Sequence, residues 1–60
     1  MPADLLTAAD RLGIARDSEA LTTAEFVYNE ALASGYGHDT ALDMARASLR
    51  SATIKVPIFA

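Results

Sequence analysis

The sequence has no cysteine and no tryptophan, and it contains a single histidine. The missing cysteines exclude an internal disulfide and any zinc site built from cysteine and histidine. A chain of 60 residues buries only roughly 60% of the surface that its unfolded form exposes, so its stability is marginal without a cross-link. Self-association or docking to a partner protein is the remaining route to stability, and we expect the chain to use one of them.

Long apolar runs and strong charge are missing as well. No stretch approaches the roughly 20 apolar residues that cross a bilayer, and the N-terminus lacks the basic flank of a signal peptide. We therefore expect no membrane contact and a cytoplasmic location. The formal net charge of −3 is small and has the wrong sign for a protein that coats nucleic acid, which disfavours a nucleic-acid partner.

Groups able to carry out chemistry are few. The only imidazole, His38, stands next to Asp39, and neither a nucleophile nor a metal-ligand spacing accompanies this pair. We interpret His38 as a solvent-facing residue beside the start of a helix. The sequence therefore predicts no enzyme, no catalytic or metal-ligating residue and no cofactor.

Three segments show the periodicity of amphipathic helices, and the first covers residues 3–12. Its apolar positions are Leu5, Leu6, Ala8, Ala9 and Leu12. Gly13 then supplies a residue typical of helix ends. Residues 14–21 allow two interpretations: Asp17 or Ser18 caps a short helical turn, or the segment is an irregular connector.

The second helix is predicted to start at Thr22, because Thr22 and Glu25 have the spacing of a capping box. Its apolar stripe consists of Ala24, Val27, Tyr28, Ala31 and Leu32. Gly35 falls where the left-handed residue that ends a helix belongs, and Tyr36 is expected to fold back against this end. Tyr28 and Tyr36 are interpreted as edges of the core with exposed hydroxyl groups.

The third helix is predicted to be capped by Asp39 or Thr40. Its apolar face consists of Ala41, Leu42, Met44, Ala45, Ser48, Leu49 and Ala52. The small residues of this face allow a close approach of the second and third helices, which we expect to form an antiparallel hairpin. Arg46 and Arg50 form the opposite ridge, where Asp43 can reach Arg46.

The last residues change to the alternation of a strand. The apolar residues of this alternation are Ile54, Val56 and Ile58. Pro57 lacks an N–H, so the segment suits only an edge strand. Two arrangements remain open, because the tail could strap the helices or pair with another chain. The predicted architecture is all-α: a small three-helix domain over residues 1–52, followed by an extended C-terminal tail over residues 53–60.

Phe26 does not belong to the apolar stripe, since it lies about 200° from Ala24 around the helix axis. An aromatic side chain on a polar face is either covered by the N-terminal helix, the tail or a second copy, or it anchors a partner. We therefore predict a non-catalytic protein–protein interaction module, either a homo-oligomer or a small subunit or adaptor of a larger assembly. The predicted contact residues are Phe26, Ile54, Val56, Ile58 and Phe59.

Residues 31–36, with Ala41 and Met44 downstream, resemble the middle of a DNA-binding helix-turn-helix. The resemblance implies a recognition role for the third helix and makes a small DNA-binding regulator the alternative function. The residues it would aim at DNA are Gly37, His38, Asp39, Thr40, Leu42 and Asp43. The candidate anion contacts are Arg46, Arg50 and Lys55. Residues 35–46 also resemble the loop and second helix of ubiquitin-associated domains. Both resemblances rest on residues that are common in helical hairpins.

Overall fold

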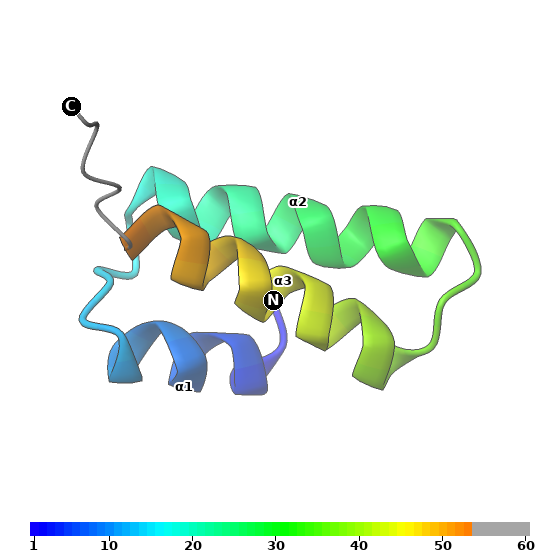
Figure 1. Cartoon of the computed structure of the whole chain (residues 1–60), viewed down its shortest axis with the longest axis horizontal. Helices are drawn as coiled ribbons and strands as arrows, with labels where there is room; N and C mark the ends of the chain where they lie inside the picture. The colour runs from blue at the N-terminus through cyan, green and yellow to red at the C-terminus, as the bar shows by residue number, and fades with distance from the viewer. Residues whose placement is uncertain (54–60) are drawn as a thin grey trace, which may run out of the picture.

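The computed structural model describes residues 1–53, which form three helices joined by two short connections (Figure 1). The helices are α1 (Ala3–Arg11), α2 (Glu19–Ala33) and α3 (His38–Thr53). The predicted all-α fold is confirmed. α2 and α3 run in opposite directions and make the most extensive contacts with each other, as the predicted hairpin requires. α1 lies along one side of this hairpin and covers only the half away from the turn at Gly35.

The residue that caps the start of α2 is Ser18, and not Thr22. The Ser18 Oγ accepts a hydrogen bond from the backbone N–H of Ala20 at 3.1 Å, and the helix starts at Glu19. The prediction of a capping box at Thr22 is therefore wrong. Thr22 lies inside the first turns of the helix, where its hydroxyl donates to the Ser18 carbonyl at 3.4 Å. Ser18, four residues upstream of Thr22, satisfies the same kind of free N–H group, so the helix extends back to it.

The start of α3 also lies earlier than predicted. His38 is the first helical residue, and the backbone N–H of Ala41 donates to the Gly37 carbonyl at 2.9 Å. Asp39 and Thr40 are thus inside the first turn and do not cap it. The carboxylate of Asp39 still lies where the positive end of the helix dipole favours an acid.

Both glycine stops are confirmed, and they have the same geometry. Gly13 and Gly35 adopt φ angles of 74° and 98°, in the left-handed region that glycine enters without a steric penalty. At α2, the N–H of Tyr36 donates to the Ala31 carbonyl at 3.1 Å. At α1, the N–H of Ile14 donates to the Ala9 carbonyl at 2.9 Å. Each helix end therefore closes with a Schellman motif, which satisfies carbonyl groups left free by the last turn.

The core of residues 1–53 consists of four leucines packed among alanines. Its largest fully buried side chains are Leu5, Leu21 and Leu49. The other buried residues are Ala9, Ala24, Ala31, Ala41, Leu42 and Ala45. Leu21 is absent from the predicted apolar stripe of the second helix, because that helix was predicted to start at Thr22. This small core places α1 against both helices of the hairpin.

Two large residues of the predicted apolar faces are exposed. Leu32 is 40% exposed, because it lies in the last turn of α2, beyond the part of the hairpin that α1 covers (Figure 1). Met44 is 41% exposed, because it lies about 200° around α3 from the buried Leu42. Ala52 is exposed too, in the final turn of α3. Periodicity therefore placed Leu32 and Ala52 on the correct side of their helices without showing how far the cover extends, whereas its placement of Met44 on the buried face of α3 is wrong.

Within residues 1–53, no helix combines the length and the apolar character that crossing a bilayer would require.

Candidate protein interaction site

Phe26 lies at the middle of α2 on the outer face of the hairpin. Its side chain is 62% exposed, the largest value among the exposed large apolar residues of the described chain. Of the alternatives for Phe26, cover by the N-terminal helix is wrong, because α1 packs on the opposite side of α2, where Ala24 is buried. Phe26 is therefore accessible to another molecule.

Acidic side chains flank Phe26 along the same face of α2. Glu30 follows it by four residues and Glu19 precedes it by seven, so all three lie within about 60° around the helix axis. We call these residues, Glu19, Phe26 and Glu30, the acidic ridge. All three are exposed, and within residues 1–53 neither glutamate forms an ion pair. The ridge thus offers an apolar anchor with a carboxylate on each side.

A groove of about 480 Å³ runs between α1 and α3. It is lined by Asp4, Thr7, Ala8, Arg11, Leu12, Arg46 and Arg50. The two predicted anion contacts of the third helix, Arg46 and Arg50, therefore lie together, and Arg11 of α1 joins them. Sequence reasoning missed Arg11, because nothing in the local pattern shows that α1 lies beside α3. We call this feature the arginine groove.

The cations outnumber the carboxylates in the arginine groove. Its lining holds three guanidinium groups and one carboxylate, that of Asp4. Arg46 Nη1 lies 3.6 Å from Asp43 Oδ1 on its own helix, as predicted. Arg11 and Arg50 form no ion pair with any other described residue. Ala8 and Leu12 supply an apolar wall, so the groove suits a ligand that carries both a carboxylate and an apolar group.

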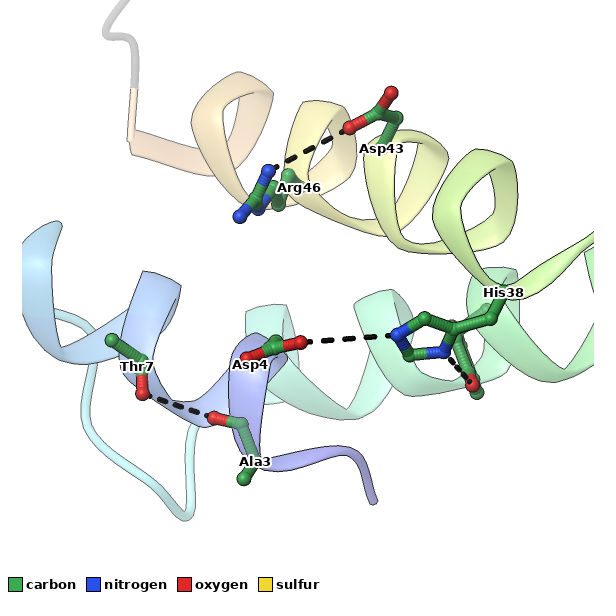
Figure 2. A network of polar contacts seen from close by, with 7 residues as sticks. Ala3, Asp4, Thr7, His38, Asp43 and Arg46 are labelled. Atoms are coloured by element: carbon green, nitrogen blue, oxygen red, sulfur yellow. Dashed lines mark hydrogen bonds and ion pairs between the residues drawn. The ribbon is translucent and has the colours of Figure 1, made fainter.

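A second polar cluster joins the three helices at the start of α3. The Tyr28 hydroxyl and His38 Nδ1 are hydrogen-bonded at 2.8 Å, and the two rings meet edge to face with centroids 5.7 Å apart. On its other side, His38 Nε2 lies 3.8 Å from Asp4 Oδ2 (Figure 2). The acid that His38 faces is therefore Asp4 of α1, and the sequence neighbour Asp39 is not involved.

This cluster links α1, α2 and α3, and its polar contacts are exposed to water. The side chains of His38 and Asp4 are 50% and 66% exposed, so water screens their attraction and the pair contributes at most about 1 kcal/mol. Neither His38 nor Tyr28 lines the arginine groove. Within residues 1–53, no three histidine, aspartate or glutamate side chains come together in a group suited to a metal ion.

The structure also locates the residues that the helix-turn-helix resemblance would aim at DNA. Leu42 is 6% exposed and belongs to the core, so its side chain faces away from any ligand of α3. Asp39 and Asp43 are exposed on the first turns of the helix. Their carboxylates would meet phosphate groups if this end of α3 entered a DNA groove.

The predicted tail contacts lie outside the described residues. They are Ile54, Val56, Ile58 and Phe59, together with the candidate anion contact Lys55. Thr53, the first residue of the predicted tail, is the last residue of α3.

No family model, no curated protein and no solved structure matches this chain.

Proposed function

We propose that this chain is a non-catalytic protein–protein interaction module, which contacts its partner through the α2 face centred on Phe26. The single observation that carries the proposal is the 62% exposure of the Phe26 side chain. Aromatic residues at the centre of a surface patch are the side chains that most often dominate protein–protein binding energy. The module acts as a homo-oligomer or as a small subunit of a larger assembly.

The distribution of large apolar side chains supports this proposal. Only three large side chains of the described residues are fully buried, all of them leucine. Within residues 1–53, six large apolar residues are exposed, among them Phe26 at 62% and Tyr36 at 50%. A domain with so small a core gains stability when a second molecule covers part of this surface.

A protein partner fits the surface better than DNA. The outer face of α2 carries the carboxylates of Glu19 and Glu30 beside Phe26. The first turn of α3, which a helix-turn-helix would insert into DNA, carries Asp39. Both features repel phosphate groups, whereas a protein surface can supply cations for the carboxylates and an apolar pocket for the ring.

Site-specific photocrosslinking tests the proposal. We would replace Phe26 by a photoreactive phenylalanine analogue in the host cell and irradiate it, and we expect a protein adduct of defined mass. The matched control carries the same analogue at Tyr36, which is similarly exposed but lies at the turn, away from the α2 face. If position 26 yields no adduct beyond that of the control, the α2 face is not a protein contact and the proposal is wrong.

A further inference from the structure

We infer that the partner of the acidic ridge is a second copy of this chain, and that the ridge of one copy docks in the arginine groove of the next. The inference rests on the proposed function and names the partner. It follows from three observations on the described residues: the charges of the two surfaces, the spacing of their side chains, and their positions on the molecule.

The charges of the two surfaces are opposite, and most of them have no ionic partner among residues 1–53. Glu19 and Glu30 of the ridge form no ion pair within residues 1–53, and the same holds for Arg11 and Arg50 of the groove. Docking brings these carboxylates and guanidinium groups together. Arginine is suited to this contact, because its planar guanidinium group can bind both oxygens of a carboxylate.

The spacing of the side chains also agrees. Phe26 and Glu30 are one turn apart on α2, as Arg46 and Arg50 are on α3, so each pair advances about 6 Å along its helix. When Glu30 meets Arg50 or Arg46, the Phe26 ring lies one turn away, within reach of the apolar wall formed by Ala8 and Leu12. A guanidinium group beside the ring adds a cation–π contact.

The positions of the two surfaces determine the type of assembly. The ridge lies on α2, whereas every residue that lines the groove belongs to α1, α3 or the residue that follows α1. A copy can therefore use its ridge and its groove at the same time. The contact joins unlike surfaces, so association continues beyond a dimer to a ring or a linear chain of copies.

The contact is small, which makes the association weak. One helix face in one groove buries less than the roughly 1,600 Å² of a standard interface, and the whole structure exposes 4107 Å². We expect self-association in the range of about 10 μM to 1 mM, which low ionic strength strengthens and about 0.5 M salt weakens, since all the charges are exposed.

Sedimentation analysis of the purified whole chain tests the inference with two variants. The groove variant combines Arg46→Glu and Arg50→Glu and keeps its ridge. The ridge variant combines Phe26→Ala and Glu30→Gln and keeps its groove. All four side chains are exposed, so both variants are expected to fold, which circular dichroism verifies. The matched control, Arg16→Glu, changes an exposed arginine outside the groove.

We expect the average mass of the unmodified chain and of Arg16→Glu to rise with concentration beyond that of a dimer. Each double variant alone stays monomeric. An equimolar mixture of the two forms a pair of one copy each and nothing larger, because only one intact ridge and one intact groove can meet. An isologous contact, such as Phe26 against Phe26, produces no such pair.

Three results would overturn the inference: an unmodified chain that stays monomeric at about 1 mM and low salt, a groove variant that associates normally, or a mixture that forms no pair. The proposed function fails separately. If the purified chain is monomeric while the position 26 crosslink captures a different protein in cells, the α2 face is an interaction site and the second copy is not its partner.

Discussion

The side-chain oxygen of Ser18 determines where α2 begins, and thereby the length of the ridge. It accepts the Ala20 N–H at 3.1 Å, which satisfies one of the free donors of the first turn. With this start, Glu19 is the first residue of α2 and lies on the same face as Phe26. A single hydroxyl group therefore adds a carboxylate to the proposed contact surface.

Replacement of Ser18 tests this role. We expect Ser18→Ala to lower the free energy of unfolding by about 1 kcal/mol, because the first turn loses its cap. Thr22→Ala is the matched control, since it removes only a 3.4 Å bond to the Ser18 carbonyl in an exposed position. Its effect should stay within about 0.5 kcal/mol. Urea unfolding followed by circular dichroism measures both, and a larger loss for Thr22→Ala would contradict the assignment of Ser18 as the cap.

The hairpin of α2 and α3 depends on the backbone conformation at Gly35. Its φ of 98° lies in a region that side chains with a Cβ rarely adopt, and this conformation lets the Tyr36 N–H reach the Ala31 carbonyl. The turn that follows leads the chain back, so that α3 packs along α2. Through the same turn, His38 reaches Tyr28.

Substitutions at Gly35 separate conformation from crowding. A Cβ added at Gly35 meets no atom within 4 Å, so the cost of Gly35→Ala comes from the backbone alone. We expect a loss of about 1–2 kcal/mol for Gly35→Ala and a smaller loss for Gly35→Asn, because asparagine tolerates the left-handed region better than alanine. Thermal unfolding ranks the stabilities of the two variants, and an unchanged stability of Gly35→Ala would show that the turn does not require positive φ.

The stability of the whole molecule depends on very few large side chains. Leu5, Leu21 and Leu49 are the largest fully buried residues of the part of the chain that the structure describes, one from each helix. Each contributes about 1.5–3 kcal/mol through burial, whereas the net stability of a domain of 60 residues is roughly 3–9 kcal/mol. Truncation of one of these leucines therefore removes a large part of the free energy of unfolding.

Leu49→Ala tests the size of this dependence. The side chain is 0% exposed, and we expect its truncation to cost about 2–5 kcal/mol and to unfold much of the population at room temperature. The control is Leu32→Ala, which removes the same atoms from a side chain that is 40% exposed. It should cost less than about 1 kcal/mol. If the denaturation curves of the two variants coincide, the assignment of Leu49 to the core is contradicted.

The helices and their ends could be predicted from the sequence because they depend on neighbours in the chain. Periodicity placed all three helices, and the glycines at positions 13 and 35 marked two of their ends correctly. The starts of the second and third helices were predicted wrongly, because several residues can cap a helix and the sequence does not show which one does. The spacing of Thr22 and Glu25 favours a start at Thr22, whereas the structure has the cap at Ser18.

The candidate site depended on contacts between helices, which local patterns do not contain. The packing of α1 beside α3 brings Arg11 to Arg46 and Arg50, although at least 35 positions separate them. The same packing joins Asp4 to His38 and leaves the outer face of α2 uncovered. Periodicity specifies which face of a helix is apolar, but the number and length of the helices that cover this face determine which residues stay exposed. The periodic pattern therefore determined the helices of this protein, whereas their packing determined its groove and its exposed ridge.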